Sequence, residues 1–193
     1  MIAGRIRYEA EPTQRSRFLV TAAPATTEDD ARALLAEVVT EMPDASHHCW
    51  AWRIALPAID RAGDDGEPSG SAGRPILAQL TGRDIIDSAV IVTRYFGGTK
   101  LGVGGLVRAY GGAAGEALDK ADLVDWHHYI TVEVVHAYND TNAVVRCMAT
   151  HSATDVNVVY ADVVVRSIRL ADDAVDAFRT GIEDATSGRV TIT

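Results

Sequence analysis

The sequence lacks any hydrophobic run long enough to cross a membrane, and it has only two cysteines, Cys49 and Cys147, which lie far apart. A membrane-spanning helix needs about 20 consecutive apolar residues, and the N-terminus MIAGRIRYEAE has no apolar signal-peptide core. The cysteines form neither a CxxC metal clip nor a disulfide framework, so buried thiols are expected. The sequence therefore predicts a cytoplasmic protein with no membrane partner.

Positive charge is also scarce. The chain carries 18 Lys and Arg residues against 27 Asp and Glu residues, a net charge of −9 at pH 7. Indiscriminate binding of nucleic acid depends on neutralising phosphates, so the bulk charge argues against it. Residues 88–115 are locally different, because they contain Arg94, Lys100 and Arg108 and no acid. An anion-binding site is expected there.

The same stretch is rich in glycine. A glycine inside a helix costs roughly 1 kcal/mol relative to alanine, so local helix propensity does not explain several of them in one helical pattern. Something is expected to approach this backbone closely, either another element of the fold or a ligand. The glycines concerned are Gly97, Gly98, Gly102, Gly104, Gly105, Gly111, Gly112 and Gly115.

Hydrophobic periodicity predicts an ordered series of elements in the first two thirds of the chain. The strand over 46–56 should place Trp50 and Trp52 on a core face. The apolar run 89–92 has no polar face, which predicts a central strand covered on both sides. The full series is a hairpin over 1–22, a helix over 26–42, the strand over 46–56, a loop over 57–70, a helix that begins near Pro75, the central strand and a glycine-rich helix.

The last third begins a new pattern, which predicts a second domain. Its elements follow the order β-α-β-β-α-β, which is the ferredoxin-like order. We therefore expect an α+β protein with domains over 1–125 and 126–193, and with His127 and His128 as surface residues at the boundary. The expected elements are strands over 129–136, 156–160, 163–170 and 189–193 and helices over 140–150 and 172–185.

The segment RYFGGTKLGVGG (94–105) could hold a phosphate, because glycine amides that lead into a helix N-terminus form an anion site. The candidate contacts are Arg94, Lys100 and Arg108. It is not a P-loop, since no Lys-Ser/Thr pair follows the glycines. The alternative is that the glycines let the helix lie close against the sheet. The amides expected to assist phosphate binding are those of Gly97, Gly98 and Gly102.

The acidic loop DDGEPSGSAG (64–73) allows two interpretations. Its acids Asp64, Asp65 and Glu67 could bind a divalent cation, or could place a carboxylate near a histidine for proton transfer. The loop could instead be structural, with a turn at Asp65-Gly66, a helix cap from Ser69 or Ser71, and one carboxylate paired with Arg94. A buried arginine needs such a partner.

The adjacent strand residues His47 and His48 point to opposite faces, so they cannot both bind one metal without distortion. His48, on the tryptophan face, is expected to be a hydrogen-bonded core residue, whereas His47 is left open. Ser69 and Ser71 lie outside a GxSxG motif and have no evident base. We therefore assign no catalytic residue, metal or cofactor.

Several motifs occur together: Ser16-Arg17-Phe18, PDASHHCWAW (43–52), DDGEPSGSAGRPIL (64–77) and VTRYFGGTKLGVGGLVRAYG (92–111). In this order and spacing they resemble the YigZ/IMPACT family. The resemblance implies an N-terminal domain of the ribosomal protein S5 domain 2-like fold and a C-terminal domain similar to elongation factor G domain V. Eukaryotic members regulate translation through an additional N-terminal domain, which has no counterpart in this sequence.

These observations support a first hypothesis of a non-enzymatic regulator linked to translation, which binds RNA or a ribosome-associated partner at the glycine-rich site. The alternative is an enzyme that acts on a phosphorylated small molecule in a cleft between loops 64–73 and 97–105. A third hypothesis is a homodimeric scaffold.

Overall fold

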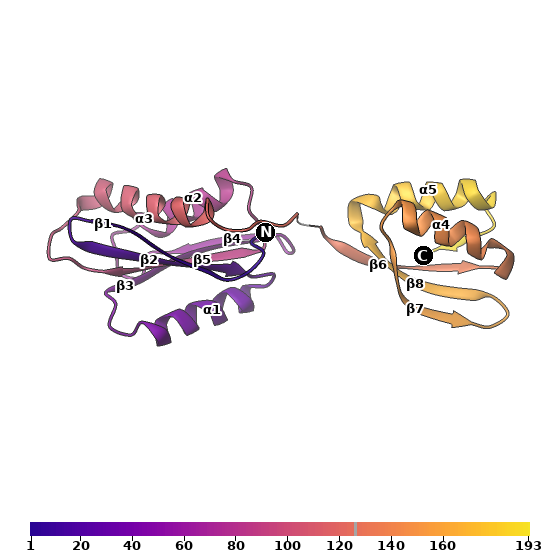
Figure 1. Cartoon of the computed structure of the whole chain (residues 1–193), viewed down its shortest axis with the longest axis horizontal. Coiled ribbons are helices and arrows are strands. Elements are labelled where there is room, and N and C mark those ends of the chain that lie inside the picture. The colour runs from indigo at the N-terminus through magenta and orange to yellow at the C-terminus, as the bar shows by residue number, and fades with distance from the viewer. Residues whose placement is uncertain (126) are drawn as a thin grey trace. The chain divides into compact units, whose positions relative to one another are not determined.

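The computed structural model describes residues 1–125 and 127–193 and divides the chain into two compact units, Met1–Trp126 and His127–Thr193. Each unit combines one β-sheet with helices, so the predicted mixture of helix and sheet is confirmed (Figure 1). Within the described residues, no helix has the length and apolar character needed to cross a membrane.

The first unit is built on a five-stranded antiparallel sheet with the strand order β1-β2-β5-β3-β4. Helix α1 covers one face, and α2 and α3 cover the other (Figure 1). The strands are β1 (Ile6–Thr13), β2 (Ser16–Pro24), β3 (His47–Ile54), β4 (Ile59–Gly63) and β5 (Ser88–Tyr95), and the helices are α1 (Glu28–Glu41), α2 (Gly73–Gly82) and α3 (Gly102–Leu118).

Strand β5 lies at the centre of this sheet, and its prediction as a strand covered on both sides is confirmed. Val90 and Val92 are fully buried among residues of the α2 and α3 side, whereas Ala89 and Ile91 are fully buried on the α1 side. Alternate side chains of a strand point to opposite faces, so a sheet with helices on both sides requires an apolar residue at every position.

Helix α1 begins where its sequence predicts. Thr27 accepts a hydrogen bond from the amide of Asp30, and the Asp30 carboxylate accepts one from the amide of Thr27. This capping box satisfies amides that have no partner inside the helix.

The tryptophan face of β3 is part of the core, as predicted. Cys49 and Ala51 on the opposite face are also fully buried, because α2 covers that side, and the expectation of a buried Cys49 thiol is confirmed. One prediction beside this strand needs correction. The predicted loop over 57–70 contains strand β4, which pairs with β3 from Trp50 to Ile54. This short edge strand is stabilised by its pairing with β3, and its polar residues carry no hydrophobic period.

The glycines between 97 and 115 meet different neighbours. A Cβ atom on Gly97 would lie 2.1 Å from the carbonyl carbon of Arg15, so this glycine lets the chain pass against the turn between β1 and β2. A Cβ atom on Gly115 would lie 2.8 Å from Oε1 of Gln79 in α2, whereas one on Gly112 would meet no described atom within 4 Å. Gly97 and Gly115 therefore admit other elements of the fold.

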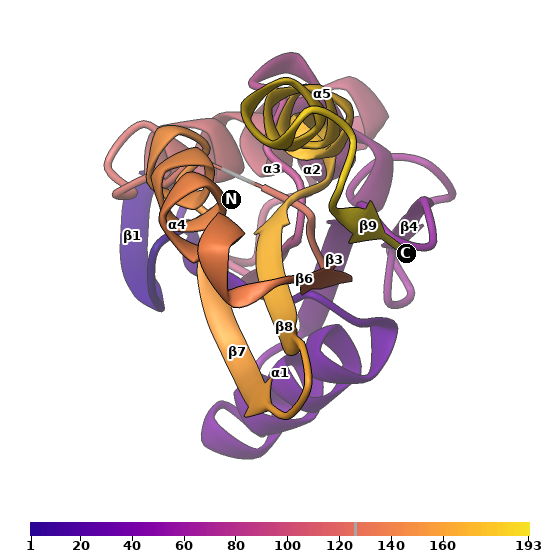
Figure 2. The same ribbon diagram turned by 90° about the vertical axis from the view of Figure 1, so that its right-hand side faces the viewer.

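The second unit has the predicted element order, with a four-stranded sheet in the order β7-β8-β6-β9. Helices α4 and α5 lie on one face of the sheet (Figure 2), where Val134, Ile168 and Phe178 form the fully buried centre of its core. Its elements are β6 (Tyr129–His136), α4 (Thr141–Thr150), β7 (Thr154–Tyr160), β8 (Val164–Ala171), α5 (Val175–Thr186) and β9 (Thr191–Ile192), with short 3₁₀ turns at Tyr138–Asp140 and Asp172–Ala174.

The contrast between Gly97, which lies against backbone, and Gly112, which has room for a side chain, can be tested with one pair of variants. Gly97→Ala is expected to lower the free energy of unfolding of the first unit by roughly 1–3 kcal/mol, because the new methyl group clashes with backbone. Gly112→Ala is expected to raise it by about 1 kcal/mol, because alanine favours the helix and has room. Denaturant unfolding followed by the fluorescence of the stacked pair Trp50 and Trp52 measures both. Equal effects of the two variants would contradict the assignment.

Candidate functional site

Arg94 of strand β5 and Glu67 of the acidic loop form a buried ion pair in the first unit. Nη1 of Arg94 lies 2.6 Å from Oε1 of Glu67, and the two residues are only 4% and 9% exposed. Nη2 of Arg94 donates to Oγ of Ser16 at 3.1 Å. The guanidinium lies 5.7 Å from the ring centre of Phe18 and 5.3 Å from that of Phe96. The prediction that one acid of the loop pairs with Arg94 is confirmed, and that acid is Glu67.

The Glu67 carboxylate also connects α3 and β3 to this pair. The Tyr110 hydroxyl donates to Oε1 of Glu67 at 2.8 Å, and Nε2 of His47 lies 3.8 Å from the same oxygen. Burial raises the pKa of Tyr110, with neighbouring Cys49 and Glu67 adding to the effect, so the phenol remains a protonated donor. In the sequence, Tyr110 is only one residue of the motif over 92–111, and nothing in its spacing revealed this polar contact.

Asp64 organises the acidic loop. Its carboxylate accepts hydrogen bonds from the amides of Gly70, Ala72 and Gly73 at 2.7, 2.9 and 2.8 Å. Burial alone would raise the pKa of Asp64, but these three backbone donors outweigh it and lower the pKa. Because Gly73 begins α2, Asp64 supplies the cap of that helix.

The prediction that Ser69 or Ser71 caps α2 is therefore wrong. The first residue before the helix makes no side-chain cap, and the Ser71 hydroxyl is buried without a hydrogen-bond partner in the described part of the chain. The predicted turn at Asp65-Gly66 is confirmed: both residues have positive φ angles, 43° and 84°, and the Glu67 amide donates to the Asp64 carbonyl at 2.9 Å.

The two histidines are both held by hydrogen bonds. His48 is 8% exposed, its Nδ1 lies 3.1 Å from Oγ1 of Thr93, and its amide donates to the Asp65 carboxylate at 2.6 Å. The prediction of a hydrogen-bonded core histidine is confirmed. Nδ1 of His47 lies 2.7 Å from the Asp65 carbonyl oxygen. Over residues 1–125 and 127–193, no three His, Cys, Asp or Glu side chains gather as metal ligands would.

The glycine-rich turn leads into an uncapped helix. Helix α3 has no side-chain cap and no acid in its first turn, as far as the described residues show. Its first amides therefore lack intrahelical partners and present the positive end of the helix dipole. Gly98 and Gly102 have positive φ angles of 84° and 69°, which glycine adopts without strain. Lys100 and Arg108 are exposed, and neither makes an ion pair with another described residue.

A pocket of about 350 Å³ lies between the acidic loop and the start of α3. It brings together four of the predicted site residues, Glu67, Arg94, Lys100 and Gly102, while the other predicted residues lie outside its lining. Five apolar residues that were not predicted as site residues complete it. They are Pro68, Phe96, Leu101, Val103 and Leu106.

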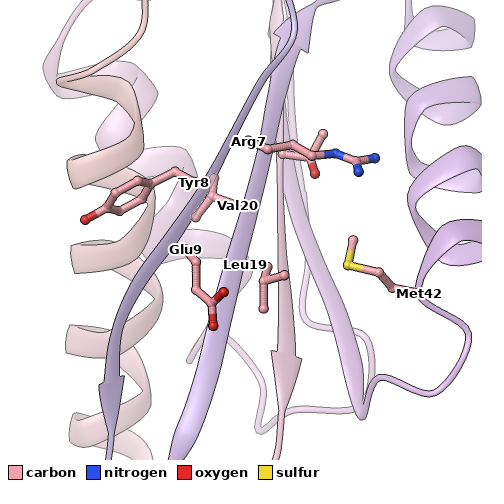
Figure 3. A pocket seen from close by; sticks show the side chains of 7 residues that line it. Arg7, Tyr8, Glu9, Leu19, Val20 and Met42 are labelled. Atoms are coloured by element: carbon pink, nitrogen blue, oxygen red, sulfur yellow. The ribbon is translucent and has the colours of Figure 1, made fainter.

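A second, smaller pocket of about 220 Å³ lies on the β1–β2 hairpin beside α1 (Figure 3). Arg7 extends toward α1, where it pairs with Glu41, while Tyr8 extends to the other side of the sheet and donates to Glu116 of α3 (Figure 3). Glu9 pairs with Arg17. The two charged residues of the lining, Arg7 and Glu9, are thus each paired with a residue outside the pocket, and we assign this pocket no ligand.

The fold and this site define a protein of two units, each with helices and an antiparallel sheet, in which a buried arginine–glutamate pair lies beside a pocket at the start of a glycine-rich helix. The chain belongs to the IMPACT family, because the family profile described as the Impact N-terminal domain matches residues 14–118. The resemblance drawn from the motifs is thereby confirmed.

Two curated relatives show the extent of the likeness. An IMPACT family member of Thermus thermophilus is 52% identical over 116 residues, which cover 58% of this chain and 62% of the relative. The Escherichia coli IMPACT family member YigZ is 44% identical over 111 residues, which cover 56% of this chain and 54% of YigZ. The chain thus spans little more than half the length of these relatives. A solved structure of a hypothetical protein matches with a TM-score of 0.70 at 30% identity, over 100% of this chain and 94% of that one.

The ion pair can be tested by removing the acid alone. Glu67→Gln is expected to lower the free energy of unfolding by about 3–5 kcal/mol, because it leaves the Arg94 charge buried without a counter-charge. Tyr110→Phe removes one hydrogen bond to Glu67 and is expected to cost only about 1 kcal/mol. Denaturant unfolding at pH 7 compares the two, and a Glu67→Gln variant no less stable than Tyr110→Phe would contradict the account.

The role of Asp64 predicts a dependence of stability on pH. Because its folded pKa is lowered, its contribution is complete above the ordinary value of about 3.9 and is lost as the pH falls through the folded pKa. Asp64→Asn is expected to be less stable at pH 7 and to lose less stability between pH 5 and pH 2 than the unchanged protein. Thermal unfolding over this range measures the difference, and parallel pH profiles would refute it. Asp29→Asn, on α1, serves as the control for an acid at another helix.

Proposed function

We propose that this protein is a non-enzymatic regulator linked to translation, and that its first unit binds RNA at the glycine-rich turn and the start of α3. The observation that carries the proposal is the uncapped, acid-free N-terminus of α3 beside the exposed side chain of Lys100. Helix N-termini with free amides bind phosphate oxygens, and a lysine adds charge. Membership of the IMPACT family supports the link to translation.

The charge distribution supports a local contact rather than general adhesion to nucleic acid. The chain as a whole carries a net charge of −9, which opposes a polyanion. Glu67, the acid among the described residues that line the pocket at the start of α3, is neutralised by Arg94. Lys100 and Arg108 are therefore the proposed phosphate contacts, with the amides of Gly98 and Gly102 beside them. The amide of Gly97, also expected to assist, donates instead to Oγ of Ser16 at 3.2 Å. Arg94 itself forms the ion pair with Glu67, which holds the acidic loop in place beside the site.

The folds of the two units are part of the same proposal. The second unit has its first and third strands, β6 and β8, at the centre of the sheet, and both helices on one face, which supports the ferredoxin-like assignment. We propose the ribosomal protein S5 domain 2-like fold for the first unit, supported by the family resemblance, and independent folding of the domains 1–125 and 126–193.

The alternative of an enzyme acting on a phosphorylated small molecule is favoured by one observation, the pocket between the two loops. Its candidate acid and base groups are nevertheless bound within the fold: Glu67 to Arg94 and Tyr110, and His47 to the Asp65 carbonyl. A general base must reach the proton that it removes. We therefore favour binding over catalysis.

The proposed phosphate contacts can be tested with a matched lysine control. Lys100→Ala with Arg108→Ala is expected to weaken binding of single-stranded RNA and to reduce the slope of log K against log salt by about 0.7 for each lost contact. Lys120→Ala removes the chain's other lysine, whose Nζ lies 4.2 Å from the centre of the Tyr8 ring, beyond the far end of α3. This control variant is expected to leave the RNA affinity and the salt slope unchanged.

Filter binding across a salt series measures these effects. Absence of salt-dependent RNA affinity in the unchanged protein would refute the RNA proposal. Affinity capture from cells tests the alternative partner. If the protein captured ribosomes through Lys100 and Arg108 but bound no free RNA, the partner would be a ribosome-associated protein instead.

A further inference from the structure

We infer that the pocket beside α3 is a subsite for one nucleotide, in which an unstacked base lies against Phe96 and its phosphate lies at the N-terminus of α3. This inference rests on the proposed function and specifies the form of RNA that the site accepts, a single strand with one base turned out of the stack.

The size and lining of the pocket match such a ligand. Its volume of about 350 Å³ lies at the small end of the range for small-molecule sites. The lining divides by chemistry, because Phe96, Leu101 and Leu106 provide apolar surface, while Lys100 and the backbone of Gly102 provide donors. A nucleotide has the same division between a flat, weakly polar base and a charged phosphate.

The electrostatics of the pocket select an anion. Among the described residues that line it, Glu67 is the one acid, and Nη1 of Arg94 lies 2.6 Å from its Oε1, so their charges cancel. What remains is the ammonium of Lys100 and the positive end of the α3 dipole. A neutral or cationic ligand would leave both without a counter-charge.

The exposed aromatic ring selects a planar group. Phe96 is 49% exposed and lines the pocket, so its ring is accessible to a ligand there. The Arg94 guanidinium, 5.3 Å from its ring centre, and the hydrogen bond from the Phe96 amide to Oγ of Ser46 help to fix its position. Bases of single-stranded RNA stack on such rings, whereas bases inside a duplex are not available.

A second, independent feature points to a ligand at this place. Arg94 lines the pocket and is 4% exposed, yet its Nε is a buried donor with no hydrogen-bond partner within the described residues. Buried donors are nearly always paired, and an exception calls for an explanation. An acceptor on a bound base would supply the missing partner.

Titration calorimetry on the full chain with adenosine 5′-monophosphate, adenosine and inorganic phosphate tests the subsite directly. The monophosphate is expected to bind at least 10-fold more tightly than adenosine or phosphate, because it alone fills both halves of the pocket. Phe96→Ala is expected to weaken its binding about 10-fold, and Phe96→Tyr, which keeps the ring, less than 3-fold.

A third variant separates loss of binding from loss of folding. Gly104 lies in the first turn of α3, and a Cβ atom there would make an ordinary contact of 3.7 Å with Nη1 of Arg108. Gly104→Glu should favour the helix, because it replaces a helical glycine and places an acid near the positive end of the dipole. The same acid repels a phosphate. Binding is expected to fall at least 10-fold while the thermal unfolding midpoint stays the same or rises.

The outcomes distinguish this inference from the proposed function. If single-stranded RNA bound through Lys100 and Arg108 but Phe96→Ala changed nothing and the monophosphate bound no more tightly than inorganic phosphate, the subsite would be overturned and the RNA proposal would stand. If the monophosphate bound as described but RNA did not, the subsite would stand with a free nucleotide as its ligand, and the RNA proposal would fail. Duplex RNA that bound as tightly as a single strand, with no effect of Phe96→Ala, would also overturn the inference.

Discussion

The buried ion pair between Arg94 and Glu67 is the interaction on which the rest of the first unit's site depends. Two charges removed from water are costly unless they meet and their remaining groups are satisfied. Here the pair holds the acidic loop against the central strand, and Tyr110 adds α3 to the same carboxylate. The first role of the ion pair is therefore to hold these three elements together. It sets the distance between two loops, and the space left between them is the pocket.

The same pair decides the electrostatics at the surface. In a chain with a net charge of −9, an acid beside a helix N-terminus would be expected to repel anions. Because Glu67 is occupied by Arg94, the positive end of α3 and the Lys100 side chain remain available. The buried pair thus permits an anion site in an acidic protein. It also explains why Arg94, which the sequence suggested as a phosphate contact, instead pairs with Glu67 in the wall of the pocket.

The glycines show that one sequence feature can have several physical causes. Gly97 and Gly115 accommodate neighbouring backbone and side chain, Gly98 and Gly102 adopt positive φ angles, and a Cβ atom at Gly104 would make only an ordinary contact with Arg108. Neither alternative considered from the sequence covers them all. Gly97, which admits a neighbouring turn, and Gly102, which lines the pocket, lie within a few residues of one another, and only their neighbours in space separate them.

By itself, the sequence determined the features that depend on local order. The capping box of α1, the fully apolar strand β5 and the element order of the second unit follow from residues close together in the chain, so periodicity and capping revealed them. The tertiary structure decided what depends on distant residues: that β4 pairs with β3, that Asp64 and not a serine caps α2, and that Glu67 and not its neighbours meets Arg94. Each of these is a choice among chemically similar groups, and it is made by distances that no spacing along the chain encodes.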